Sequence, residues 1–409
     1  MNAFSKIDMA EATRLTRAGK LAEAMAVLQG RALPGDPEPR TAAATRRLAL
    51  GSSALRSAPS SQSKSSSERP TPPTAGDSED PGVREALPGL AYRMRALRER
   101  LPKMHAFGRL GEGAGSVSIH VPEGARFEER TFSNGAGARN YKVYVPSGYN
   151  GQPLPVVVML HGCTQNPDDF AAGTRMNEVA EAQTFLVVYP HQPQSANMKK
   201  CWNWFDAAEQ RRDGGEPSLI AGIALRTIEE FSADPARVYV AGLSAGGAAA
   251  AILATTHPDL FAAAGVHSGL ACGAARDMPS AFAAMAGTTN IPPHAETPAA
   301  PTIVFHGDAD RTVHVVNADH VAAQAGRATM LSEIVTRGET PGGVTYTRKI
   351  GLDASGKEIL EQWVVHGMGH AWSGGSASGS YSDPRGPDAS REMIRFFLKH
   401  VNGRASGRA

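Results

Sequence analysis

A glycine-flanked serine between a strand pattern and a helix pattern is the feature that most constrains how this chain can fold. Residues 237–241 combine β-branched and aromatic side chains as a buried strand does, and residues 248–254 are rich in alanine, a strong helix former. Between them, Gly242-Leu-Ser-Ala-Gly246 fits the pattern G-x-S-x-G. In a strand–turn–helix setting this pattern holds a serine on a strained elbow with its hydroxyl exposed. We therefore expect Ser244 to be a nucleophile, although chance also produces the pattern in chains of this glycine content.

The composition argues against several classes of protein. The 409 residues suffice for one large or two ordinary domains. A formal net charge of +2, with 20% charged residues, gives no reason to expect a nucleic-acid partner. No apolar run approaches the length of a transmembrane helix, so we expect no membrane span.

Two features bear on the cellular compartment. Acidic residues stand near the N-terminus where a signal peptide would have its apolar core, so we expect no secretion signal and a cytoplasmic location. The three cysteines, Cys163, Cys201 and Cys272, permit one disulfide at most, and this count suits the cytoplasm. An extracellular location is the alternative.

Three segments precede the main domain. Residues 1–33 have apolar side chains at helical spacing and predict an N-terminal helical segment. Residues 34–82 are dominated by Ser, Pro, Gly and charge, which predicts a disordered linker. Residues 83–115 return to helical spacing with many arginines. The helices either pack on the main domain or bind a partner or surface, the arginine-bearing stretch being suited to a surface.

Residues 116–403 have the sequence pattern of an α/β domain. Strand patterns alternate with helix patterns, which predicts a mostly parallel central sheet with helices on both faces. The apolar run 155–160 predicts a strand covered on both sides. Further strands are expected at 127–132, 140–145, 184–189 and 301–305, a hairpin at 343–367 turning at 353–356, and helices at 218–231 and 390–401.

A nucleophilic serine on this type of sheet needs a carboxylate and a histidine at the same edge, in the order Ser, Asp, His. The strand ending near residue 305 runs into Asp308 and Asp310; we expect Asp310 to orient the base and Asp308 to order the turn. After the last strand, His370 lies in a glycine-rich loop where its imidazole can reach the serine. His366 is expected to be a packed, hydrogen-bonded residue of the strand.

Backbone amides complete the expected site. A glycine turn after residue 160 places the amide of Cys163 near the serine, so this amide and that of Ala245 would form an oxyanion hole. Cys163 itself lacks an evident base and is not expected to be a nucleophile. No Cys/His spacing resembles a metal site and no glycine loop fits phosphate binding, so we expect no metal and no cofactor. Four residues are expected to form a wall of the substrate cleft: Trp202, Asn203, Trp204 and Trp372. Packing in the core is the alternative for the aromatic patch at 201–205.

Several motifs together resemble a known family, the short-chain polyhydroxyalkanoate (poly(3-hydroxybutyrate), PHB) depolymerase-like esterases of the α/β-hydrolase superfamily. The resemblance covers about residues 140–401 and implies the fold, the Ser-His-Asp triad and a serine esterase without a cofactor. The motifs are Leu160-His-Gly-Cys-Thr-Gln165, Cys201-Trp-Asn-Trp-Phe205, Gly242-Leu-Ser-Ala-Gly246, His306-Gly-Asp-Ala-Asp310, Gly367-Met-Gly-His-Ala-Trp372 and residues 380–390.

The resemblance leaves the substrate open. We expect PHB or its oligomers, with acetyl-xylan or feruloyl esters as the alternative for an enzyme. A catalytically inactive binding module, with the N-terminal helices as its working part, is the alternative from another class. We expect the chain to differ from secreted depolymerases in two ways, because residues 1–11 do not read as a signal peptide and no polymer-binding domain is expected after residue 401.

One further expectation follows from the resemblance, and another from the composition of the N-terminal region. The family's turn at Cys163 and loop at Cys201 share one rim of the sheet, so the two sulfurs form a disulfide under oxidising conditions or remain two buried thiols. An insoluble granule favours an enzyme that adsorbs to its surface. The N-terminal region, with its basic amphipathic stretch, could contact a granule, or its helices could only pack on the hydrolase.

Overall fold

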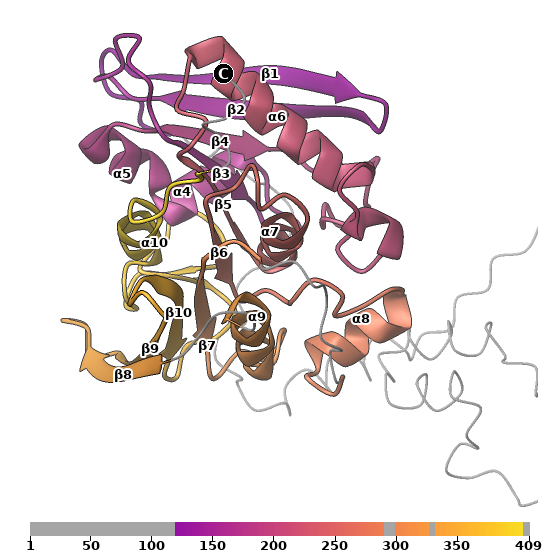
Figure 1. The fold of residues 1–409 in the computed structure, drawn as a ribbon, viewed down its shortest axis with the longest axis vertical. Coiled ribbons are helices and arrows are strands. Elements are labelled where there is room, and N and C mark those ends of the chain that lie inside the picture. The colour runs from indigo at the N-terminus through magenta and orange to yellow at the C-terminus, as the bar shows by residue number, and fades with distance from the viewer. Residues whose placement is uncertain (1–118, 290–298, 327–331, 404–409) are drawn as a thin grey trace, which may run out of the picture. The chain divides into compact units, whose positions relative to one another are not determined.

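The computed structural model describes residues 119–289, 299–326 and 332–403 (Figure 1). The segments predicted at residues 1–33, 34–82 and 83–115 lie outside the described residues. The described residues contain the α/β domain that the sequence predicts from residue 116 onward.

A ten-stranded sheet forms the centre of this domain, in the order β1-β2-β4-β3-β5-β6-β7-β10-β9-β8. The strands from β4 to β10 in this order pair in parallel, and antiparallel pairs flank them on both sides. The predicted mostly parallel sheet is therefore confirmed. The strands are β1 Arg126–Asn134, β2 Gly137–Val145, β3 Val156–Leu160, β4 Leu186–Pro190, β5 Val238–Leu243, β6 Ala263–His267, β7 Thr302–Gly307, β8 Ser332–Glu339, β9 Thr345–Leu352 and β10 Glu358–Val365.

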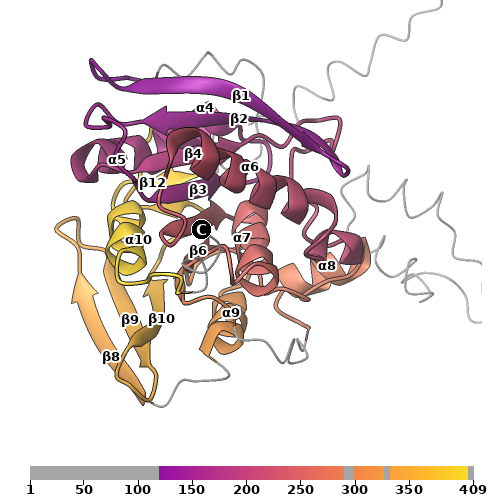
Figure 2. The ribbon, with the colours of Figure 1, turned by 45° about the horizontal axis from the view of Figure 1, so that its top comes forward.

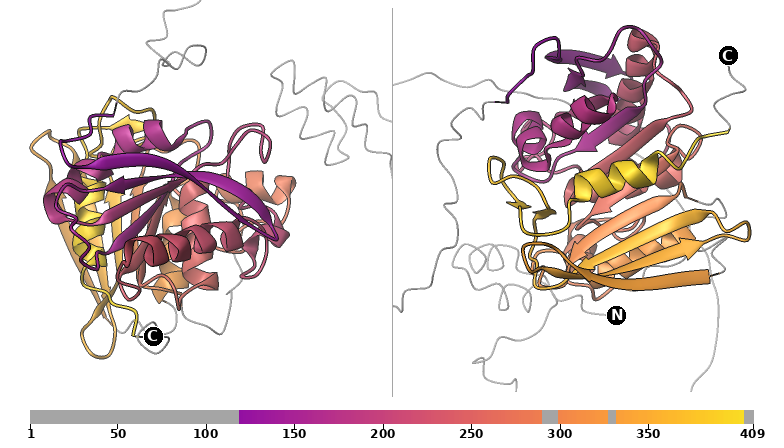
Figure 3. Two further views of the ribbon diagram at one scale, coloured as in Figure 1. Left: turned by 90° about the horizontal axis from the view of Figure 1, so that it is seen from above. Right: turned by 90° about the vertical axis from the view of Figure 1, so that its left-hand side faces the viewer.

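Helices cover both faces of the sheet, because the central strands are apolar on both sides. Every residue of β3 is buried, and its alternate residues belong to two different core clusters, as with Val158 and Met159. One face is covered by α6 (Gly215–Phe231) and α7 (Ala245–Thr256), and the other by α4 (Pro167–Thr174), α5 (Met176–Gln183) and α10 (Ala389–Phe397) (Figure 1). Figure 3 shows α10 lying across its face of the sheet.

Most of the predicted elements are confirmed. The β1–β2 and β9–β10 pairs are antiparallel hairpins, and the sheet ends in β1 on one side and β8 on the other (Figure 2). The last helix buries Met393, Ile394, Phe396 and Phe397 as expected. Smaller elements are α8 (Met278–Met285), α9 (Val316–Gly326), η1 (Ala207–Gln210), and the short strands β11 (Trp372–Ser373) and β12 (Ser382–Asp383).

The sequence analysis missed β6, whose residues Ala-Ala-Gly-Val-His lack the run of β-branched side chains that marks the other strands. Close packing explains the small residues. A Cβ at Gly265 would lie 2.7 Å from the sulfur of Met393 and 3.1 Å from the ring of Phe397. Helix α10 therefore packs closely against β6, and a side chain at Gly265 would require Met393 and Phe397 to shift.

A disulfide joins the loops that follow two neighbouring strands. Cys163 lies after β3 and Cys201 lies in the loop after β4; their Cα atoms are 4.2 Å apart and their sulfurs are bonded. The sequence left a bridge and two thiols as equal alternatives, and the structure contains the bridge. Cys272 is a buried free thiol.

The disulfide predicts a thiol count. Protein purified without reductant, then unfolded and titrated with an aromatic disulfide reagent, should show one thiol, that of Cys272, and reduction should raise the count to all three cysteines. A Cys272→Ser control should then show none before reduction. Three thiols in the unreduced wild type would rule out the bridge.

Candidate active site

The candidate nucleophile lies at the sharp turn between β5 and α7. Ser244 has φ 58° and ψ −119°, a conformation that side-chain-bearing residues rarely adopt. Its amide donates a hydrogen bond to the carbonyl of His267, the last residue of β6, at 2.9 Å. The backbone is thus held in a strained elbow at the carboxyl end of the sheet, as the sequence pattern predicts.

Two glycines make this elbow possible. A Cβ at Gly242 would collide with the carbonyl of Gly246, and a Cβ at Gly246 would collide with the carbonyl of Leu160 at the end of β3. The backbones of β5, α7 and β3 therefore touch without intervening side chains. This contact explains why both glycines of the G-x-S-x-G pattern are needed.

The structure brings Asp310 and His370 together. Asp310 follows β7 and His370 follows β10, and these strands are parallel neighbours. His370 Nδ1 lies 2.7 Å from Asp310 Oδ2, and the carboxylate is buried. The other oxygen, Oδ1, accepts the amides of Thr312 at 2.8 Å and Val313 at 2.9 Å.

The charge of Asp310 sets the tautomer of His370. Burial alone would raise the pKa of Asp310, but hydrogen bonds from His306 and His370 outweigh it and hold the pKa well below its usual range. An ionised carboxylate can only accept, so Nδ1 of His370 carries the proton. In the neutral imidazole with this tautomer Nε2 is the acceptor, which is the form a general base needs.

Asp308 and His366 form a second pair at the surface. His366 Nδ1 lies 2.7 Å from Asp308 Oδ2, while Asp308 Oδ1 accepts the amide of Gly367 at 2.7 Å. The hydroxyl of Thr347 forms a hydrogen bond of 2.9 Å with Nε2 of His366. Asp308 thus orders the turn after β10. His366 is thus hydrogen-bonded as expected, but it follows β10 and leaves 39% of its side chain exposed, so the expectation that it packs within the strand is wrong.

Two backbone amides are predicted to form the oxyanion hole. That of Ala245 follows the serine in the chain, and that of Cys163 belongs to a turn that lies beside it. Ala245 is the first residue of α7, and the first N–H groups of a helix have no partner within the helix. The same end carries the positive pole of the helix dipole. Cys163 follows Gly162, where a Cβ would lie 3.6 Å from the Cβ of Ser244. The turn that bears Cys163 therefore lies directly beside the serine.

Gln165 fixes this turn, and the sequence analysis gave it no role. Its buried side chain accepts the amide of Gly162 at 2.9 Å and donates to Asp169 Oδ2 at 2.9 Å and to the carbonyl of Ser380 at 3.1 Å. It thereby ties the turn after β3 to the loop downstream of His370. Its place at the end of the motif at residues 160–165 was the only sequence signal for such a role.

The aromatic residues expected to line a substrate cleft lie in the core instead. Trp202 has no exposed surface and donates its indole N–H to the carbonyl of His161 at 3.0 Å. Trp372 is 1% exposed and donates to Ser390 Oγ at 3.1 Å, and Trp204 is also buried. Asn203 is bonded to Glu216. The three tryptophans therefore follow the core-packing alternative, because apolar rings this large are stabilised more by full burial than by lining an open surface.

Residues 119–289, 299–326 and 332–403 contain neither a candidate metal cluster nor a candidate membrane-spanning helix. These ranges contain no cluster of three or more His, Cys, Asp or Glu residues arranged to hold a metal ion. None of the helices in them combines the length and apolarity needed to cross a bilayer.

Comparison with protein families identifies one match. The family model described as "Esterase PHB depolymerase" matches residues 139–342. The matched segment includes Ser244 and Asp310 and ends before His370.

Curated relatives fall into three kinds of esterase. The chain is 32% identical over 239 residues to poly(3-hydroxyalkanoate) depolymerase C of Paucimonas lemoignei, a match that covers 56% of this chain and 57% of that protein. It is 33% identical over 158 residues to acetylxylan esterase A of Talaromyces purpureogenus, covering 38% and 40%. It is 36% identical over 140 residues to feruloyl esterase B of Neurospora crassa, covering 34% and 46%. The chain thus spans about half the length of the curated relatives it matches.

A solved structure shares the fold. The acetyl xylan esterase from Aspergillus awamori aligns with a TM-score of 0.53 at 21% sequence identity, over 67% of this chain and 99% of that one. At this identity the likeness concerns the fold alone, which is the α/β-hydrolase fold. Together with the family match and the strained serine elbow, it leads to one conclusion: the chain belongs to the PHB depolymerase-type esterases of the α/β-hydrolase superfamily.

Proposed function

We propose that this protein hydrolyses carboxylic esters with Ser244 as nucleophile, His370 as general base and Asp310 as the residue that orients the base. The observation that carries the proposal is the 2.7 Å hydrogen bond between buried Asp310 and His370, formed at the sheet edge where Ser244 sits on its strained elbow. This arrangement also argues against the alternative of an inactive binding module, which would have no need of an ionised carboxylate buried against an imidazole.

The proposed reaction follows the chemistry of a serine triad. Ser244 Oγ attacks the ester carbonyl carbon while Nε2 of His370 takes the hydroxyl proton, and Asp310 stabilises the imidazolium. The amides of Ala245 and Cys163 donate to the tetrahedral oxyanion. When the intermediate collapses, the alcohol leaves with the proton from His370. Water then attacks the acyl-enzyme with the same histidine as base, releasing the acid and restoring the serine.

For the substrate, we propose PHB or its oligomers. The support is the family match and the relative from Paucimonas lemoignei, whose matched segment is the longest of the three reported above. The relatives described as acetylxylan and feruloyl esterases support carbohydrate esters as the second candidate. All three classes present an ester carbonyl to the same triad, so they differ in the acyl group and in the alcohol that leaves, but not in the mechanism.

The triad proposal predicts a graded set of losses. Ser244→Ala should lower kcat on p-nitrophenyl butyrate by roughly 10⁶-fold, and Asp310→Asn by about 10⁴-fold, because the nucleophile and the tautomer of the base are lost in turn. Asp308→Asn is the matched control and should change kcat only a few-fold. A larger loss in Asp308→Asn than in Asp310→Asn would show that the wrong carboxylate has been assigned.

The substrate proposal is tested by product analysis on a matched panel. Wild-type protein should release 3-hydroxybutyrate from hydroxybutyrate oligomers at a higher kcat/KM than it releases acetate from acetyl-xylan or ferulate from feruloyl esters. Ser244→Ala serves as the background for each substrate. A preference for either carbohydrate ester would replace the polyester assignment and leave the triad untouched.

For the compartment, the disulfide favours the extracellular alternative over the cytoplasm. A bridge between Cys163 and Cys201 persists in oxidising surroundings and is rare in the cytosol. We propose in addition that the N-terminal region, residues 1–115, brings the enzyme to insoluble polymer granules through the arginine-bearing stretch within residues 83–115.

The recruitment proposal predicts a separation of two activities. A chain that starts near Gly111 should keep its kcat on soluble esters but lose binding to PHB granules in a pelleting assay, because the chemistry lies in the α/β domain. The full-length Ser244→Ala variant is the control for binding without hydrolysis. Equal pelleting of the short and full-length chains would end the recruitment proposal, and loss of soluble activity in the short chain would favour helices that only pack on the hydrolase.

A further inference from the structure

A buried carboxylate outside the triad is the centre of a second polar cluster. Glu216, in the first turn of α6, is 5% exposed. Its Oε1 accepts Asn203 Nδ2 at 2.7 Å and also Nε2 of Gln192, and its Oε2 accepts the amide of Asn203 at 2.7 Å. The nearest cation, on Arg139, is 3.7 Å away.

Holding this carboxylate in the core has a cost. Burial raises the pKa of Glu216 to about 7, and the hydrogen bonds from Asn203 and Gln192 offset only part of that effect. A buried charge is retained where its hydrogen bonds fix a particular arrangement. The partners of both oxygens are donors, so the ionised carboxylate, which only accepts hydrogen bonds, suits this position better than the neutral acid or an amide of the same shape.

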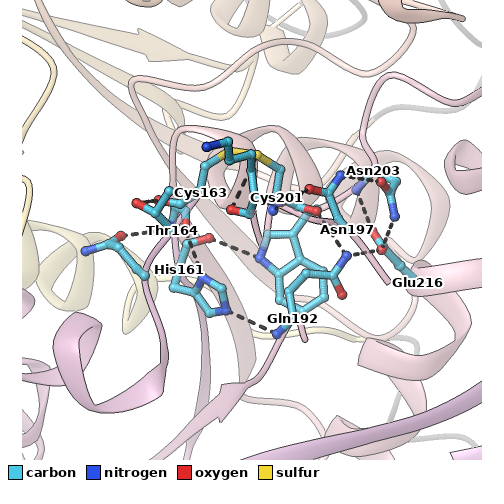
Figure 4. The surroundings of a disulfide bond; sticks show 12 residues. His161, Cys163, Thr164, Gln192, Asn197, Cys201, Asn203 and Glu216 are labelled. Carbon is cyan, nitrogen blue, oxygen red and sulfur yellow. Dashed lines mark hydrogen bonds between the residues drawn. A yellow bond between two sulfur atoms is a disulfide. The ribbon is translucent and has the colours of Figure 1, made fainter. Parts of the chain in front are cut away.

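The segment that Glu216 holds is attached to the turn beside Ser244. Four links join the two: the Cys163–Cys201 disulfide, the indole of Trp202 to the carbonyl of His161 at 3.0 Å, the amide of Thr164 to the carbonyl of Lys199 at 2.6 Å, and the amide of Gln192 to Nε2 of His161 at 3.1 Å. Figure 4 shows this arrangement, with Cys201 between the Glu216–Asn203 contacts and the His161–Thr164 turn.

We infer that Glu216 is a positioning residue for the oxyanion hole, acting through the loop that carries Cys201 and Asn203 on the turn that carries the amide of Cys163. The inference rests on the proposed function of that amide. The inference assigns a supporting role to the motif at residues 201–204. Trp202 and Asn203 hold the turn that carries Cys163 and do not contact the substrate.

Small displacements at this turn have large effects on rate. Loss of one oxyanion donor costs about 10²–10³-fold in kcat, and a misplacement of about 1 Å costs roughly 10²-fold. Such donors act on the transition state more than on the bound substrate, so KM changes little when they move. A residue that only stabilised the domain would not produce this separation.

The test compares Glu216→Gln with Glu229→Gln on the same helix, where the Glu229 side chain is 76% exposed. Glu216→Gln preserves the shape but presents an amide to donors. Its kcat on p-nitrophenyl butyrate should fall about 10- to 100-fold with KM within about threefold, and Glu229→Gln should match the wild type. Unchanged kcat in Glu216→Gln would overturn the inference.

A second measurement is independent of catalysis. Hydrogen exchange of the amides at residues 161–165 and 199–204 should accelerate in Glu216→Gln and leave the strands of the sheet protected. Asn203→Ala, which removes the side-chain donor to Glu216 Oε1 and leaves the backbone amide, should do the same if Glu216→Gln does not fold. Exchange unchanged at 161–165, or faster throughout the domain, would overturn the positioning role. If wild-type protein cleaves no ester, the proposed function fails, and the exchange result still decides whether Glu216 holds the turn.

Discussion

The contact between the serine elbow and the end of β3 is the constraint on which the rest of the site depends. Gly246, at the start of α7, lies against the carbonyl of Leu160, and Gly242 lies against Gly246, with no room for a Cβ at either position. Ser244 and the turn after β3 are thereby held close to each other. Other parts of the site are attached to these two points: Asp310 and His370 across the sheet, Gln165 and the disulfide on the side of the turn.

Buried polar groups hold these parts in place because an unsatisfied one would be costly. Asp310 accepts hydrogen bonds from two backbone amides as well as from His370. The side chain of Gln165 accepts the amide of Gly162 in the turn after β3 and donates to the carbonyl of Ser380. Each such bond contributes only about 1 kcal/mol to stability, but losing one partner leaves a buried group unpaired. The network therefore determines geometry more than it determines stability.

The aromatic residues near the site are packed in the core that supports its loops. Trp202 and Trp372 were expected at the surface of a cleft, yet both are buried and each donates its indole N–H to a named acceptor. His267, at the end of β6, stacks between Phe305 and Trp372 and accepts the amide of Ser373. Rings packed in this way keep the loops that follow the strands from moving, which is the rigidity a preorganised site requires.

The sequence by itself determined the central strands other than β6, the two hairpins and the last helix, because long apolar or alternating runs have one stable placement on a two-faced sheet. It also singled out Ser244, Asp310 and His370, since each follows a recognisable strand and the strand ends of a parallel sheet meet at one edge. It missed β6, whose small residues are explained only by the close approach of α10.

Only the tertiary structure decided that Cys163 and Cys201 are bonded, that Trp202 supports the turn and that Glu216 holds the loop. The partners in these contacts come from separate elements, 38 residues apart in the case of the disulfide. Local patterns record which face of a strand or helix is buried, but not which polar group another element brings to it. That information exists only once the chain has folded.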